Sequence, residues 1–170
     1  MRSRTLQRAV GALSLIAALA AACVAPRGPA ARAQAPGEIA VIVNKSNPVD
    51  DLPLSELREY FLAERGHWPN GKGKVRVVML EPGAPAREAA LRLIYNMNEK
   101  AYVSYFLGKK FRGETLDEPR QQRSAADVIK FVSFVPGAIG YVRPEEVDAS
   151  VKVLRVDGLS PGDPGYKLKP

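Results

Sequence analysis

The sequence has almost no cysteine or histidine. Of its 170 residues, one is cysteine, Cys23, and one is histidine, His67. Because Cys23 lies near the N-terminus, the remainder of the chain can hold no disulfide, cysteine nucleophile or cysteine metal site. A single histidine argues against a multi-histidine metal site and a Ser-His-Asp triad. The carboxylate pairs Asp50-Asp51 and Glu145-Glu146 are adjacent in sequence and need not converge. We therefore expect no enzyme, no cofactor and no metal ion.

A hydrophobic run long enough to cross a bilayer is also missing. The uncharged stretch over residues 9–22 falls short of the about 20 residues that a membrane helix needs, but it has the length of a signal-peptide core. Arginines precede it, and Ala31-Arg32-Ala33 matches the A-x-A cleavage pattern. We predict a Sec-type signal peptide over residues 1–33, a periplasmic location and no transmembrane segment in the mature chain. The alternatives are a membrane anchor and lipidation at Cys23.

The mature chain has little net charge once the predicted export segment is removed. The chain has 25 Lys and Arg against 18 Asp and Glu, and five of the arginines lie in residues 1–33, which hold no acid. The mature chain of 170 − 33 = 137 residues therefore has a net charge of 20 − 18 = +2. We expect no nucleic-acid partner. The length suits one domain, which we place at residues 34–157, followed by a C-terminal tail at 158–170.

Apolar periodicity predicts alternating strands and helices. Continuous β-branched runs predict strands at 38–44, 75–80, 138–142 and 151–156. Helical spacing predicts helices at 54–62, 86–97, 98–107 and 124–135, with caps at Asn98 and Ser124. The segment over 111–123 is expected to be a polar connection, and 159–170 a surface tail. This pattern indicates an α/β fold: an open mixed, mainly parallel sheet of four to five strands, with helices on both faces.

Three loops follow or precede the predicted strands, where open α/β sheets bind ligands. They are Lys45-Ser46-Asn47, Gly83-Ala84-Pro85-Ala86-Arg87 and Pro136-Gly137-Ala138. The second opens a helix, so its N–H groups and the Arg87 guanidinium could accept an anion. The alternative is that Gly83 and Pro85 only shape the turn and that Arg87 is a solvated first-turn residue.

Several motifs resemble a known family. Residues 42–49, 54–62 and 68–71 resemble the "NPxNPV" turn, the "LSxxQLxxIFxGxxxxW" helix and its following aromatic residue in phosphate-type periplasmic substrate-binding proteins of ABC transporters. Residues 136–142 match the "PGAIGYV" segment of that family in full. The resemblance covers about residues 39–142. It implies one lobe of a type II periplasmic binding protein, phosphate as a ligand and an ABC permease as a partner.

The sequence departs from this family in two ways. The family has two lobes that clamp the ligand and about twice this length. Its phosphate-binding turn also reads "GSGTR", where this chain has residues 83–87: both hydroxyls are gone, and Pro85 removes an N–H donor. Each missing hydrogen bond to a charged ligand costs about 1.5–3 kcal/mol. The resemblance therefore implies weak oxyanion binding, or binding with a second lobe or a second copy. The candidate ligand-binding residues are Ser46, Asn47, Gly83, Arg87 and Gly137.

An alternative function is an interaction or accessory module of the cell envelope that binds no small ligand. The lost hydroxyls favour it. Trp68 is expected to pack in the core and His67 to lie at the surface. The one basic cluster, Lys109, Lys110 and Arg112, is expected to be a solvated loop, with an anion or partner surface as the alternative.

Overall fold

The structure is a computed structural model that describes residues 37–69, 73–114 and 118–170. The predicted signal peptide at residues 1–33 and Cys23 lie outside the described residues. No helix within the described ranges is long and apolar enough to cross a membrane.

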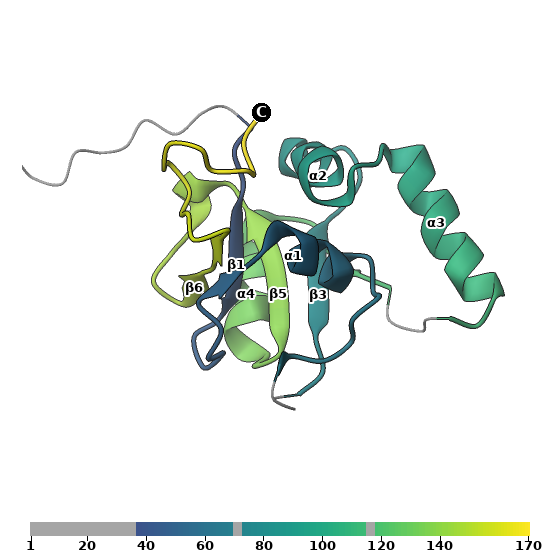
Figure 1. The fold of residues 1–170 in the computed structure, drawn as a ribbon, viewed down its shortest axis with the longest axis horizontal. Helices are drawn as coiled ribbons and strands as arrows, with labels where there is room; N and C mark the ends of the chain where they lie inside the picture. The colour runs from purple at the N-terminus through teal and green to yellow at the C-terminus, as the bar shows by residue number, and fades with distance from the viewer. Residues whose placement is uncertain (1–36, 70–72, 115–117) are drawn as a thin grey trace, which may run out of the picture. The chain divides into compact units, whose positions relative to one another are not determined.

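The core of the fold is a five-stranded sheet in the order β4-β3-β5-β1-β6. The parallel pairs are β3 with β4 and β3 with β5, whereas β1 is antiparallel to both β5 and β6. Four strands therefore share one direction and β1 opposes them (Figure 1). This confirms the predicted open mixed, mainly parallel sheet. The strands are β1 (Ala40–Asn44), β3 (Arg76–Leu80), β4 (Arg120–Gln122), β5 (Ala138–Val142) and β6 (Val151–Val153).

The fourth predicted strand, at 151–156, is two short strands. Its second half, β7 (Arg155–Val156), leaves the main sheet and pairs in parallel with β2 (Asp51–Leu52). The buried Leu154 separates the two halves, and its N–H donates to the carbonyl of Val41.

Helices cover both faces of the sheet, as predicted. On one face, α4 (Ala125–Phe134) approaches so closely that a Cβ at Gly140 of β5 would lie 3.0 Å from Val128 Cγ1 and 2.7 Å from Val78 Cγ1. On the opposite face, Met79 accepts a hydrogen bond from the Tyr102 hydroxyl. That face carries α1 (Leu54–Phe61), α2 (Pro85–Ala90), its π-helical continuation (Leu91–Tyr95) and α3 (Glu99–Phe111).

Side-chain caps define the starts of two helices. Asn98 Oδ1 accepts from the N–H of Ala101, and Ser124 Oγ accepts from the N–H of Asp127, so both predicted caps are confirmed. Before α3, the chain turns at Asn96, whose φ of 54° is left-handed. The helix predicted over 86–97 therefore ends in a π-helical turn.

Two segments differ from the prediction. The polar connection over 111–123 contains β4, which pairs with β3 as an edge strand. The segment over 159–170 is not wholly at the surface, because Tyr166 and Leu168 are buried. The Leu168 carbonyl accepts from the N–H of Ile39, and the Tyr166 hydroxyl donates to the Ile39 carbonyl at 3.0 Å. These contacts attach the segment to the residues that lead into β1.

Candidate functional site

The predicted ligand-binding residues lie at two opposite ends of the sheet. Because β1 is antiparallel to β5, its carboxyl end places Ser46 and Asn47 where β5 begins, next to Gly137. Gly83 and Arg87 follow the carboxyl end of β3, which is parallel to β5. The length of β3, about 13 Å, separates the two groups. A single small anion cannot touch both, so the five residues do not form one site.

At the first end, the asparagines stabilise the backbone. Asn44 Nδ2 donates to the carbonyls of Val132 and Ser133 at the end of α4, both at 2.8 Å. Asn44 Oδ1 accepts from the N–H and the hydroxyl of Ser46. Asn47 is buried and its Oδ1 accepts from the Val49 N–H, while its Nδ2 has no hydrogen-bond partner among the described residues.

Gly137 is also fixed by packing. A Cβ at this position would lie 2.2 Å from the carbonyl oxygen of Lys74. The Gly137 carbonyl accepts from Trp68 Nε1 at 3.1 Å. Trp68 is buried, which confirms its predicted place in the core, and His67 is exposed as expected. The "PGAIGYV" match therefore coincides with close backbone packing at Gly137 and Gly140 rather than with an open loop.

At the second end, Arg87 is buried, with 1% of its side chain exposed. Its Nε and Nη2 donate to the two carboxylate oxygens of Glu99 at 2.8 and 2.7 Å, and its Nη1 donates to the Leu80 carbonyl. The guanidinium lies 5.0 Å from the centre of the Tyr102 ring. The alternative of a solvated Arg87 is therefore wrong. Hydrogen bonding from Arg87 lowers the pKa of Glu99, which stays ionised.

A cavity of about 200 Å³ lies beside this ion pair. Its lining includes Pro82, Arg87, Glu99, Tyr102, Lys110 and Gln121. Gly83, in the turn above, has a φ of +91°, and a Cβ at this position would meet no atom within 4 Å. Of the predicted basic cluster, only Lys110 lines the cavity: Lys109 Nζ donates to the Leu62 carbonyl, and Arg112 pairs with Glu114. An anion in this cavity would meet Arg87 and Lys110, but it would also meet the carboxylates of Glu99 and Glu118.

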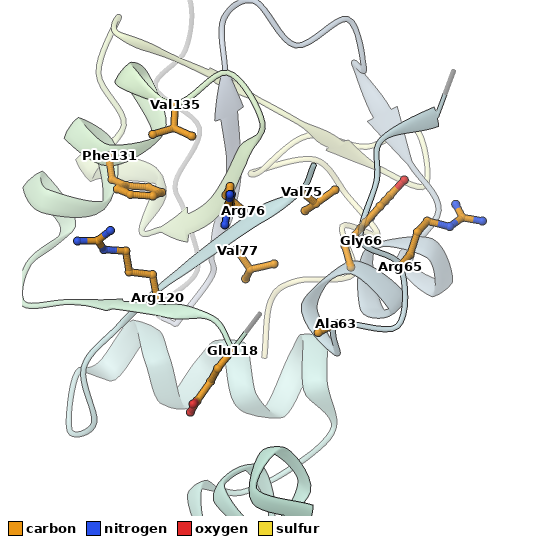
Figure 2. Close-up of a pocket in the computed structure, with 11 residues that line it drawn as sticks. Ala63, Arg65, Gly66, Val75, Arg76, Val77, Glu118, Arg120, Phe131 and Val135 are labelled. Atoms are coloured by element: carbon orange, nitrogen blue, oxygen red, sulfur yellow. The ribbon is translucent and has the colours of Figure 1, made fainter. Parts of the chain in front are cut away.

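A larger cavity, of about 430 Å³, lies across the edge of β3 near the start of that strand (Figure 2). Its lining includes Arg76, Val77, Glu118, Arg120, Phe131 and Val135, and we call it the arginine pocket. Sequence reasoning placed none of these residues in a binding site. Arg76 and Arg120 are the only available signal: each is a charged residue on a short strand, a pattern that a solvated surface explains equally well.

The fold of this chain is similar to part of several solved proteins. No family model matches the sequence. Among solved structures, an ABC-type phosphate transport receptor from Vibrio cholerae is similar over 73% of this chain and 48% of its own, with a TM-score of 0.60 and 20% identity. A putative phosphate ABC transporter substrate-binding protein with bound phosphate from Clostridium perfringens also covers 73% of this chain and 46% of its own, with a TM-score of 0.60 and 24% identity.

PstS from Borrelia burgdorferi is similar too, at 13% identity and a TM-score of 0.57, over 73% of this chain and 49% of its own. At such identities the likeness is one of fold. This chain spans slightly less than half the length of each of these proteins.

Proposed function

We propose that this protein is an extracytoplasmic relative of the phosphate-type substrate-binding proteins that binds a small oxyanion weakly at the turn between β3 and α2. The observation that carries the proposal is the buried Arg87 beneath that turn, next to a cavity that also presents Lys110. The cavity lies at the carboxyl end of β3, where ligands bind in open α/β sheets. The similar substrate-binding protein from Clostridium perfringens, which holds bound phosphate, supports phosphate as the first anion to test.

Two features of this end of the sheet limit the affinity. Ala84, Pro85 and Ala86 offer no hydroxyl, and proline has no N–H to donate. The Glu99 carboxylate already binds the guanidinium of Arg87 in a bidentate pair. An incoming anion must therefore compete with this carboxylate for Arg87. We therefore expect a dissociation constant in the millimolar range, equivalent to about 4 kcal/mol.

A nuclear magnetic resonance titration of the purified protein with phosphate and sulfate tests the proposal. We expect saturable amide shifts at Gly83, Ala84 and Arg87. Lys110→Gln should weaken binding, because it removes a cation from the cavity lining. Lys100→Gln is the matched control: Lys100 lies on the same helix, is exposed and does not line the cavity. Absence of shifts at millimolar anion, or equal effects of the two variants, would refute the proposal.

Export and partnership belong to the same proposal. A periplasmic protein of this kind would work with an ABC permease, or with a second lobe supplied by another chain or another copy. Mass spectrometry of the mature N-terminus separates cleavage after Ala33 from lipidation at Cys23. A mature chain that still contains residues 1–22 would refute export through a cleaved signal.

A second candidate function is favoured by one observation on α3. Val103, Leu107 and Phe111 are spaced four residues apart and expose 54%, 50% and 83% of their surfaces. A row of this kind on one helix face suits an interaction module of the cell envelope without a small ligand. Light scattering distinguishes the two functions: a stable assembly that Phe111→Glu disrupts, together with no anion binding, supports the module, and Phe111 does not line the anion cavity.

A further inference from the structure

Helix α3 is packed on its inner side and exposed on its outer side. Tyr102 and Phe106 are buried, and Lys109 Nζ donates to the Leu62 carbonyl. The helix lies at the margin of the molecule (Figure 1). Of the large hydrophobic side chains that the described residues expose, all but Phe134 of α4 lie on this helix. The outer side of α3 therefore concentrates the exposed apolar surface of the described chain.

Four residues of α3 share one face, because they are spaced as i, i+3, i+4 and i+7. They are Ser104, Leu107, Gly108 and Phe111, and we call them the outer face. Leu107 and Phe111 expose 50% and 83% of their surfaces, and Ser104 is also exposed. None of the four is charged. Small and large residues alternate along this face.

Gly108 has no explanation in the packing of its own chain. Glycine destabilises the interior of a helix relative to alanine, and the φ of Gly108 is not positive. Outside its own helix backbone, a Cβ at Gly108 would meet only the Arg112 guanidinium, 3.1 Å from Nη1, and this flexible group can move aside. An exposed helical glycine of this kind leaves room for the close approach of another molecule.

We propose that the outer face binds the outer face of a second copy of this chain, with the two α3 helices antiparallel about a two-fold axis. Such a contact requires a surface that is complementary to itself. With the axis between Leu107 and Gly108, Leu107 of each copy faces Gly108 of the other, and Phe111 faces Ser104. Each large side chain therefore meets a small residue, as in the packing of ridges into grooves.

The one charge on the same side of the helix favours the antiparallel direction. Lys100 precedes Leu107 by seven residues, which is two helical turns. In a parallel pair, the two Lys100 side chains would lie side by side. In the antiparallel pair they lie about 22 Å apart along the helix axis, at about 1.5 Å per residue. This separation exceeds the screening length at physiological ionic strength.

This inference rests on the second candidate function, whose interaction surface it assigns to a specific partner. It does not depend on oxyanion binding at the β3–α2 turn. Leu107 lines the cavity beside Arg87, whereas Phe111 does not. Substitution of Phe111 therefore tests the contact between copies without changing the lining of the anion cavity.

Sedimentation equilibrium of the purified protein between about 10 μM and about 1 mM tests the proposal. We expect a reversible dimer with a dissociation constant of about 100 μM, because two short helices bury less than a standard interface. Phe111→Glu should raise this constant at least about tenfold, since a charge replaces a central aromatic side chain. Phe134→Glu is the matched control: it makes the same change at a residue that is 76% exposed on α4, and it should leave the dimer unchanged.

Gly108→Leu tests the close approach of the two helices. The new side chain would fill the space that Leu107 of the second copy needs, so the dimer should weaken at least about tenfold. The melting temperature of the dilute monomer should not fall, because leucine is a better helix former than glycine. An unchanged dissociation constant for Gly108→Leu would contradict the proposed register.

A mixture of two variants tests the register directly. Phe111→Glu and Ser104→Lys should each weaken the dimer when studied alone. In an equimolar mixture, the new carboxylate of one chain would face the new ammonium group of the other, so a heterodimer should form.

A protein that stays monomeric up to about 1 mM, or equal effects of Phe111→Glu and Phe134→Glu, would overturn the proposal. A dimer that Phe111→Glu disrupts but that the mixture does not restore would overturn the two-fold register and leave the interaction module in place. Phosphatidylglycerol vesicles that bind a monomeric wild type but not Phe111→Glu would replace the second copy by a membrane surface. Phosphate titration of Phe111→Glu bears on the proposed function alone.

Discussion

Both ends of the sheet carry candidate ligand-binding residues from the family resemblance. The two ends differ in how much space lies beside those residues. Where β5 begins, the Asn44 side chain is hydrogen-bonded to two backbone carbonyls, and the backbone of Lys74 packs directly against Gly137. At the carboxyl end of β3, Arg87 and Glu99 line a cavity and Gly83 faces open space. A close motif match can therefore reflect packing, while a degraded motif can still mark the place where a ligand could enter.

The largest effect is expected at the closed end, for Gly137→Ala. The new Cβ would lie 2.2 Å from the Lys74 carbonyl oxygen, a backbone atom that can move only with its loop. We expect the free energy of unfolding to fall by about 3 kcal/mol, the upper part of the usual range for overpacking. Chemical denaturation measures the change.

The matched control is Gly66→Ala in the loop after α1. A Cβ at Gly66 meets no atom within 4 Å, so this variant should change the unfolding free energy by less than about 0.5 kcal/mol. Equal losses for the two glycine variants would contradict the packing explanation for the "PGAIGYV" match.

A smaller effect is expected for Asn44→Ala at the same end. This change leaves two carbonyls at the end of α4, those of Val132 and Ser133, without the Nδ2 donor. We expect a loss of about 2 kcal/mol in unfolding free energy. Ser46→Ala removes only an exposed hydroxyl that donates to the same Asn44, and it should cost less than about 0.5 kcal/mol. An Asn44→Ala variant with an unchanged unfolding free energy would contradict the stabilising role that we assign to the Asn44 hydrogen bonds.

The smallest effect is a pH dependence at the open end. Hydrogen bonding from Arg87 lowers the pKa of Glu99 below its ordinary value of 4.5. The ion pair therefore stabilises the fold fully above that value, and its contribution is lost as the pH falls through the lower pKa of the folded state. We expect the unfolding free energy of the wild type to decline below about pH 4.5 more steeply than that of Glu99→Gln. Denaturation curves at several acidic pH values measure both slopes, and parallel curves would contradict the pairing.

The sequence predicted the elements with strong local signals. The strand at 138–142 has the predicted bounds, and the caps at Asn98 and Ser124 form because a short polar side chain can reach the N–H three residues onward. It missed β4, since Arg120–Gln122 has neither apolar residues nor alternation. It also missed the burial of Tyr166 and Leu168, which stand singly among prolines, glycines and lysines.

The candidate site was less predictable than the fold for two reasons. A continuous apolar run predicts that a strand is buried but does not predict its direction in the sheet. Because β1 is antiparallel to β5, Ser46 and Asn47 lie at the opposite end of the sheet from Gly83. The partner of Arg87 is Glu99, which lies beyond the π-helical turn and a left-handed residue at Asn96. No local pattern anticipates a pair that forms across such a reversal.

The contact between Leu168 and Ile39 brings the two ends of the described chain side by side. A Cβ at Gly37 would lie 3.0 Å from Pro170 Cγ. A unit whose ends meet can be spliced into a single surface loop of another protein without being pulled apart, and it tolerates circular permutation for the same reason. A reporter fused after Pro170 would therefore begin next to Gly37.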